Sequence, residues 1–223
     1  LTTDSNNNAL ITCEKSKFNI AGKSGDDFSY LPAIIKDKMI TLSQFQLKEV
    51  INQTIFSIAI NHNNKMMTGE LFEVSDNTLK VVGLDGHRIA IRSIQLEGRA
   101  DDVKAVVPGK TLQEISKLMS TDAENMVNIY FTNNHILFEF DNTIVVSRLI
   151  EGEYFKINQM LSSDYETKVV INKKEFIGSI DRANLLITES EKKPIIINIT
   201  DGSLEVTVNS SKGKFNEDIN IKK

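Results

Sequence analysis

The feature that most constrains the fold is an internal repeat whose period is that of a whole domain. Segment 7–28 resembles segment 133–154, and Ile136 lies 126 residues after Leu10. In both segments, two short apolar stretches are followed by an acidic turn and then by an aromatic residue. This period is far longer than that of a solenoid repeat, so the sequence predicts copies of a domain.

A second pair of similar segments joins the middle of the chain to its end. Segment 71–81 resembles 196–206 at a spacing of 125 residues, and upstream 47–54 resembles 176–183 at a spacing of 129 residues. Chance similarity between β-meanders is the alternative, but constant spacing over long stretches argues against it. We therefore predict half a unit, a complete unit and half a unit, at 1–37, 38–156 and 157–223.

The complete unit contains both helical and strand periodicity. Apolar residues recur at helical spacing from Leu47 to about Ile58, after a candidate N-cap at Ser43, and again from Leu112 to Met119. Strands are predicted at 39–42, 70–74, 78–84, 87–96, 103–107, 127–132, 134–141 and 143–150, with turns at 75–77 and 85–86. This order predicts an α+β fold of repeated βαβββ units with two helices per domain.

Composition excludes several classes of protein. With Lys+Arg 26 and Asp+Glu 30, the net charge is −4, so overall charge does not predict nucleic-acid binding, although a local basic face stays open. No apolar run reaches the roughly 18 residues of a membrane-spanning helix. The single cysteine, Cys13, excludes an intrachain disulfide, and the chain starts without a secretory leader. We therefore expect a cytoplasmic protein that does not bind membranes.

Candidate catalytic and cofactor motifs are incomplete. Segment 21–24 ends like a phosphate-binding loop, but Lys17 stands where that loop needs a glycine. Cys13 lies in an alternating stretch and is predicted to be a small buried hydrophobe and not a nucleophile. The histidines are scattered and do not have metal-ligand spacing: His62, His87 and His135. We predict no metal, no cofactor and no enzymatic activity.

The segment from Leu84 to Ala90 stands out as a tight turn that leads into a strand. His87 in this turn has the chemistry of a general base. The structural interpretation is favoured: Asp85 and Gly86 form the turn, and His87 and Arg88 hydrogen-bond to nearby backbone. The catalytic interpretation of His87 stays open as the less favoured one.

These motifs together resemble a known family, the bacterial sliding clamp, which is the β subunit of DNA polymerase III. The resemblance covers essentially the whole chain and rests on segments Asp85–Ala90, Val106–Lys110, Ser147–Tyr154 and Arg182–Leu186. It implies a DNA clamp fold of three similar domains, with sheets outside and helices lining a bore. It also implies that the chain holds the end of the first domain, all of the second, and the first half of the third.

The resemblance implies sequence-independent contact with duplex DNA, which requires only a diffuse positive lining. Asn64 lies in a loop that approaches DNA in the family, at a position where arginine is common. The implied bore residues are basic and helical: Lys48, Lys110, Lys117, Lys173, Lys174 and Arg182. For each of them an ordinary solvated helix face is the alternative interpretation.

The resemblance also implies a pocket for short peptides with glutamine and hydrophobic or aromatic anchors, from the DNA polymerase III catalytic subunit and the clamp loader. Leu84 replaces a common threonine and Phe155 replaces a proline, and the family strand that completes the pocket lies beyond Lys223. Interdomain packing is the alternative interpretation. The implied lining is Met67, Leu84, Gly86, His87, Arg88, Ile89, Phe155 and Met160.

A third implied site is the interface of a head-to-tail homodimer ring. Phe18 and Ile20 match a strand that meets a helix of the neighbouring subunit, and Leu185 and Leu186 match that helix. With two half units, this chain alone is not expected to form a normal ring. The overall prediction is a non-catalytic processivity clamp, and the alternative is a clamp-fold module that binds peptides without encircling DNA.

Overall fold

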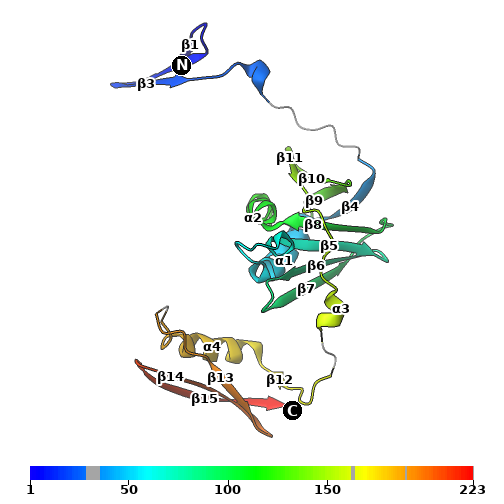
Figure 1. Ribbon diagram of the computed structural model, residues 1–223, viewed down its shortest axis with the longest axis vertical. Coiled ribbons are helices and arrows are strands. Elements are labelled where there is room, and N and C mark those ends of the chain that lie inside the picture. The colour runs from blue at the N-terminus through cyan, green and yellow to red at the C-terminus, as the bar shows by residue number, and fades with distance from the viewer. Residues whose placement is uncertain (29–35, 162–163, 189, 223) are drawn as a thin grey trace. The chain divides into compact units, whose positions relative to one another are not determined.

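The computed structural model describes residues 1–28, 36–161, 164–188 and 190–222 (Figure 1). The chain divides into two compact units, Leu1–Phe155 and Lys156–Lys223. The described strands form four antiparallel sheets accompanied by a few helices, which confirms the predicted α+β class. The further division of the first unit at residue 37 remains a prediction.

The N-terminal part of the first unit is a three-stranded meander followed by one 3-10 turn. Glu14 has φ +49°, in the left-handed region, and lies in the tight turn between the second and third strands. The elements are β1 (Thr2–Thr3), β2 (Asn8–Cys13), β3 (Ser16–Ala21) and η1 (Gly25–Asp27).

The rest of the first unit consists of two βαβββ halves that exchange their first strands. The first half is β4 (Lys38–Ser43), α1 (Gln44–Thr54), β5 (Gly69–Ser75), β6 (Thr78–Leu84) and β7 (Ile89–Gln95), with 3-10 turns η2 (Ile55–Ser57) and η3 (Lys65–Thr68). The second half is β8 (Val103–Pro108), α2 (Gly109–Leu118), β9 (Met126–Phe131), β10 (His135–Phe140) and β11 (Thr143–Arg148). The sheet orders are β7-β6-β5-β8 and β11-β10-β9-β4, so each half supplies one strand to the sheet of the other.

One apolar core joins these two sheets to α1 and α2. Helix α1 begins with a capping box in which Ser43 and Gln46 satisfy each other's backbone N–H groups. Its apolar face buries Leu47, Val50 and Ile51 against residues of both sheets. Burial of this continuous surface, worth about 25 cal/mol per Å², is what holds the two halves together.

The second unit has the same order of elements in a single copy. Its elements are α3 (Ile157–Met160), β12 (Val170–Ile171), α4 (Lys173–Asn184), β13 (Ile196–Ile199), β14 (Ser203–Ser210) and β15 (Gly213–Lys222). The sheet order is β12-β15-β14-β13, so here the first strand pairs with the last strand of its own copy. A small core of Ala183, Leu204, Val206, Val208, Ile219 and Ile221 lies between α4 and the sheet.

The strand registers test the predicted repeat. Leu71 pairs with Val82 in the first unit, and Ile196 pairs with Thr207 in the second, so both members are spaced by 125 residues. The helix caps Ser43 and Asn172 are spaced by 129 residues, as predicted.

The predicted spacing of 126 residues is wrong by one. The turn residues Glu14 and Asp141 both have φ +49°, and the strands that flank them begin 127 residues apart. Both faces of these strands carry apolar residues, so the period-2 pattern does not distinguish neighbouring registers.

Several local predictions also need correction. Helix α1 ends at Thr54 and the chain continues as the turn η2, while β7 begins at Ile89 because His87 and Arg88 belong to the preceding turn. Leu118, predicted to lie on the apolar face of α2, is exposed. Cys13, predicted to be buried, is exposed on β2.

Candidate functional site

The turn between β6 and β7 is built around one carboxylate. Asp85 Oδ1 accepts the backbone N–H groups of His87 at 3.0 Å and Arg88 at 3.2 Å, and Oδ2 accepts Arg88 Nε at 3.0 Å. The His87 N–H, more than the Arg88 contacts, holds the pKa of Asp85 below its ordinary value. Gly86 has φ +87°, which a side chain disfavours. The predicted turn at Asp85 and Gly86 is therefore present, and it leaves His87 and Arg88 exposed. The Arg88 side chain bonds to the Asp85 carboxylate and not, as predicted, to nearby backbone.

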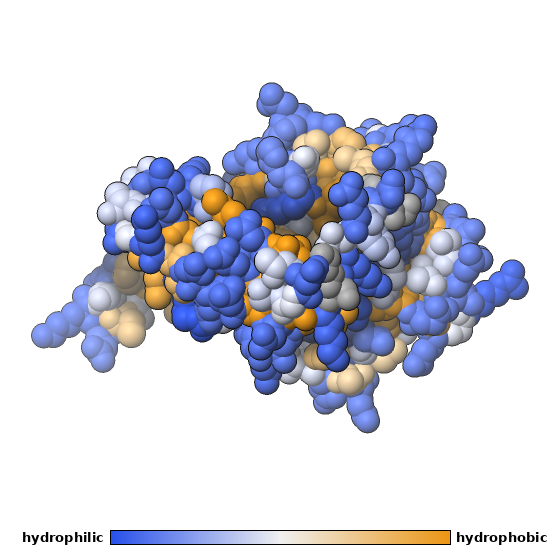
Figure 2. Space-filling view, turned by 90° about the horizontal axis from the view of Figure 1, so that it is seen from below, coloured by the Kyte–Doolittle hydropathy of each residue, from blue (hydrophilic) through white to orange (hydrophobic). Residues whose placement is uncertain are grey.

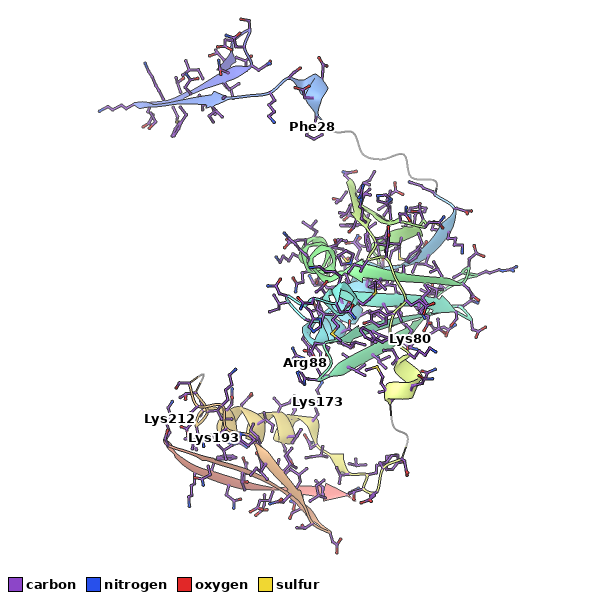
Figure 3. All side chains as sticks on the ribbon, in the orientation of Figure 1. Phe28, Lys80, Arg88, Lys173, Lys193 and Lys212 are labelled. Carbon is purple, nitrogen blue, oxygen red and sulfur yellow. The ribbon has the colours of Figure 1, made fainter. Side chains whose placement is uncertain are left out.

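Arg88 is fixed by a second contact that the sequence does not reveal. Its guanidinium carbon lies 5.8 Å from the centre of the Phe56 ring, within cation–π range. Phe56 comes from η2 and is exposed. Figure 3 shows Arg88 at the end of the β6–β7 hairpin. Arg88 is thus held between a carboxylate and a ring on the exposed surface of the turn.

Three of the predicted apolar lining residues belong to the first unit and are half-buried. Met67, on η3, is half-buried, and its methyl group lies 3.9 Å from the point where a Cβ of Gly86 would stand. Ile89 and Phe155 are also half-buried. Phe155 packs edge-on against Tyr154 with ring centres 5.5 Å apart. Half-buried apolar side chains beside exposed polar ones are typical of a recognition surface.

Leu84 has a different place from the predicted one. It is 0% exposed and lies under the turn, so it supports the surface but does not line it. The Tyr154 hydroxyl donates to the Val82 carbonyl at 3.1 Å, which attaches the segment that carries Phe155 to β6. Burial raises the pKa of the Tyr154 hydroxyl, so it stays a donor at neutral pH.

Two of the predicted DNA-facing lysines in the first unit are engaged within the fold. Lys48 Nζ donates to the Met119 carbonyl at 3.1 Å and joins α1 to the end of α2. Lys117 pairs with Glu114 at 2.9 Å on the surface of α2. These contacts favour the alternative interpretation of both residues as structural or solvated helix positions.

Lys110 differs from them. It is exposed in the first turn of α2, and it makes no ion pair within the described residues. A cation at a helix N-terminus opposes the helix dipole. Helix stability therefore does not account for the position of Lys110.

The loop between η2 and η3 is organised by Asn64. Its Oδ1 accepts the Met66 N–H at 3.1 Å, and its own N–H donates to His62 Nδ1 at 3.0 Å. The side chain of Asn64, predicted to approach DNA, thus caps η3. The sequence did not indicate this contact between His62 and Asn64.

In the second unit the predicted basic residues fall into two groups. Arg182 forms a two-pronged contact with Glu217, at 3.0 Å through Nε and 2.5 Å through a terminal nitrogen, so its charge is largely balanced. Lys173 (Figure 3) and Lys174 are exposed in the first turn of α4. Asn172 accepts the Lys174 N–H at 2.9 Å. Met160 is exposed at the end of α3.

The side chains predicted at the subunit interface are mostly uncovered. Phe18 and Ile20 are 57% and 51% exposed on β3, and Leu185 is 75% exposed after α4. Leu186 is half-buried against the core of the second unit. Figure 2 shows hydrophobic residues emerging among hydrophilic ones on the surface. The apolar groups expected to meet another subunit are therefore available in this chain.

Among the described residues no cluster of three or more His, Cys, Asp or Glu side chains is placed to hold a metal ion. The helices of the same residues are too short or too polar for one to cross a membrane.

The family of the chain is identified by comparison with known proteins. Residues 41–156 match the model of the DNA polymerase III beta subunit, central domain. This range lies within the predicted complete unit, and it contains the turn, Met67, Lys110 and Phe155.

Relatives extend the similarity to nearly the whole chain. A beta sliding clamp of Staphylococcus epidermidis is 34% identical over 221 residues, which are 99% of this chain and 58% of the relative. A crystal structure of a DNA polymerase III beta subunit of Eubacterium rectale is 64% identical with a TM-score of 0.92, over 99% of this chain and 60% of that one. The crystal structure of the sliding clamp of Bacillus subtilis is 30% identical with a TM-score of 0.88, over 99% of this chain and 58% of that one. The chain thus spans about three fifths of the length of these relatives, and it belongs to the family of DNA polymerase III beta subunits, the beta sliding clamps.

Proposed function

We propose that the protein is a DNA polymerase processivity factor, a ring that encircles duplex DNA and tethers the polymerase to it. The observation that carries this proposal is the match of 99% of the chain to beta sliding clamps, together with the central-domain match. A tether raises the local concentration of polymerase at the primer end. A tether requires no group that makes or breaks covalent bonds, so the proposed subunit is non-catalytic. Its proposed location is the cytoplasm.

For DNA contact we propose the exposed lysines in the first helical turns. Lys110, Lys173 and Lys174 place exposed positive charge at the start of a helix, where it can meet phosphate. Lys48, Lys117 and Arg182 contribute less, because each is engaged with an acceptor of the fold.

For partner peptides we propose the surface formed by Met67, Ile89 and Phe155 around the turn at Gly86–Arg88. Arg88 and His87 supply donors for a polar anchor such as glutamine, and the apolar residues supply contact area for leucine or phenylalanine. A methionine adapts to varied ligands, which suits one surface that serves several partners. For Met160, in the second unit, participation remains a prediction of the resemblance.

For assembly we propose that Phe18 and Ile20 of one subunit meet Leu185 and Leu186 of the next in a head-to-tail homodimer. The three-part division at 1–37, 38–156 and 157–223 belongs to this proposal.

The test is primer extension on a long single-stranded circular template with DNA polymerase III and its clamp loader. The natural protein that contains this chain is expected to lengthen the products severalfold. Met67→Asp should abolish this effect, whereas Met39→Asp, which changes an exposed methionine on β4, should leave it. Unchanged product length with the unaltered protein, while peptide binding persists, would favour the peptide-binding module without DNA.

A further inference from the structure

A buried carboxyl lies behind the proposed peptide surface. Glu70, on β5, is 0% exposed, and neither of its oxygens has a hydrogen-bond partner among the described residues. Burial raises the pKa of Glu70 to about 8, although the nearby Thr54 hydroxyl acts in the opposite direction. Thr54 Oγ1 already gives its proton to the Val50 carbonyl at 2.7 Å. Glu70 therefore carries a proton in the folded protein at neutral pH.

The space for this carboxyl comes from a glycine on the neighbouring strand. Glu70 and Gly83 lie next to Leu71 and Val82, the last pair of the β5–β6 ladder. A Cβ on Gly83 would lie 3.4 Å from Glu70 Oε1 and 2.7 Å from the Thr54 carbonyl oxygen. On the other side, Glu70 is opposite Val107 of β8. A Cβ at position 83 would thus collide with the Thr54 carbonyl and would touch the Glu70 carboxyl at ordinary contact distance.

One titratable group responds to Glu70. Tyr154 lies near enough that the Glu70 charge raises the pKa of its hydroxyl. No charged side chain among the described residues acts on the Glu70 carboxyl. The charged residues of the packed elements are exposed or engaged elsewhere: Lys48, Glu49, Lys65, Glu73, Lys80, Lys104, Lys110, Glu114 and Lys117.

The repeat shows that the fold does not require this carboxyl. At the spacing of 125 residues confirmed for these strands, the position equivalent to Glu70 in the second unit is Ile195. Ile195 packs against the apolar core of that unit. An apolar residue thus suffices at this place, and Glu70 costs stability, so it calls for an explanation outside folding.

Glu70 is connected to both sides of the proposed peptide surface. Gly83, beside it, precedes the turn by two residues, and Tyr154 leads directly into Phe155. An ionised carboxylate at this place would have to draw in water or move outward. We expect either response to disturb the end of β6, next to Gly83, and the Tyr154 contact with Val82.

We propose that Glu70 is a positioning residue for peptide binding: its protonated carboxyl keeps the β6–β7 turn and Phe155 in place, and release of that proton to solvent loosens both. The proposal rests on the proposed function for the identity of the ligand. It predicts a proton-dependent peptide affinity in a chain whose surface residues are unchanged.

The test is the affinity of a labelled synthetic five-residue peptide with glutamine, leucine and phenylalanine anchors, measured at pH 7.5, 8.5 and 9.5. For the unaltered chain the dissociation constant should rise by up to about 25-fold, because with a pKa of about 8 the fraction of protonated Glu70 falls by that factor between pH 7.5 and 9.5. For Glu70→Gln it should rise less than about twofold. Glu73→Gln, on the outer face of the same strand, should behave like the unaltered chain.

Backbone amide exchange of residues 83–88 without peptide provides an independent readout. The ratio of exchange rates between the unaltered chain and Glu70→Gln should grow above pH 8, since intrinsic exchange cancels in the ratio. Equal pH profiles for the two chains in both measurements would overturn the proposal. If no peptide binds at pH 7.5, the proposed peptide surface fails and the exchange ratio alone decides the role of Glu70. Glu70→Ile, which copies the second unit, replaces Glu70→Gln if that variant does not fold.

Discussion

The two units contain the same βαβββ order of elements but differ in which strands pair with each other. In the first unit β4 pairs with β9 and β8 pairs with β5, so each half lends its first strand to the other. In the second unit β12 pairs with β15 of the same copy. The exchange lets two sheets and two helices share one large core, whereas the single copy has a small core and leaves Ile196, Ile197 and Ile199 exposed on β13. One βαβββ copy has only one helix to cover its sheet, so the size of the core depends on the presence of a second copy.

The largest expected effect comes from the shared core. Phe138, in β10, and Val206, in β14, are both 0% exposed. Phe138→Ala should lower the free energy of unfolding of the first unit by about 3–5 kcal/mol, because it leaves a large cavity. Val206→Ala should cost the second unit about 2 kcal/mol. Urea denaturation followed by hydrogen exchange of each unit measures both, and equal losses in both units from either variant would show that the units do not fold separately.

The next effect concerns Glu70 and its apolar equivalent Ile195. An unfolded glutamate loses its proton near pH 4.5, whereas folded Glu70 keeps it until about pH 8. The folded state then binds more protons in this interval, so its stability falls as pH rises through it. At pH 7 the loss relative to pH 4.5 should be about 3 kcal/mol, from 1.36 kcal/mol per pH unit. Thermal unfolding of the unaltered chain and Glu70→Gln at both pH values measures this, and parallel pH dependence of the two would contradict a proton held by Glu70.

The next prediction concerns a feature that the two units share, the side-chain N-cap of the helix. Ser43 caps α1 through the Gln46 N–H, and Asn172 caps α4 through the N–H groups of Lys174 and Glu175. Ser43→Ala and Asn172→Ala should each cost about 1 kcal/mol of unfolding free energy in their own unit. The measurement is chemical denaturation of each variant. A much larger loss for one cap would mean that the repeat does not preserve the helix start.

The smallest effect concerns the first-turn lysines. Lys110→Ala should reduce the slope of log affinity against log salt for a short duplex by about 0.9, the contribution of one phosphate contact. Lys117→Ala, whose lysine pairs with Glu114, should change it less. Fluorescence anisotropy at several salt concentrations measures the slopes. A greater effect of Lys117→Ala would reverse the proposed assignment.

Short-range patterns predicted much of the fold. The turn residues Asp76 and Asn77 have φ values of +48° and +55°, as their chemistry indicates. The helix caps and the pairing of the β5–β6 and β13–β14 hairpins also follow from local spacing. The strand exchange was not predictable, because periodicity shows which face of a strand is apolar and not which strand it joins.

The turn of the candidate site could be predicted from the sequence, whereas the partners of its charged side chains could not. The turn at Asp85 and Gly86 depends on contacts within four residues, so the local sequence predicts it. The partner of Arg182 is Glu217, which is 35 residues away, so the local sequence does not predict that ion pair. Leu84 was misplaced because a strand end does not tell whether the last side chain faces core or solvent. Glu70 gave no signal, since a glutamate among apolar strand residues has the pattern of an ordinary exposed position.

The retention of the loaded protein on DNA tests the central claim most directly. The natural protein that contains this chain is loaded by the clamp loader onto a nicked circular duplex, separated from free protein, and followed after a restriction enzyme linearises half of the sample. Retention on circles and loss from linear molecules is the predicted result, because a closed ring leaves DNA only over a free end. Equal loss from both forms, or no retention on circles, would contradict an encircling clamp.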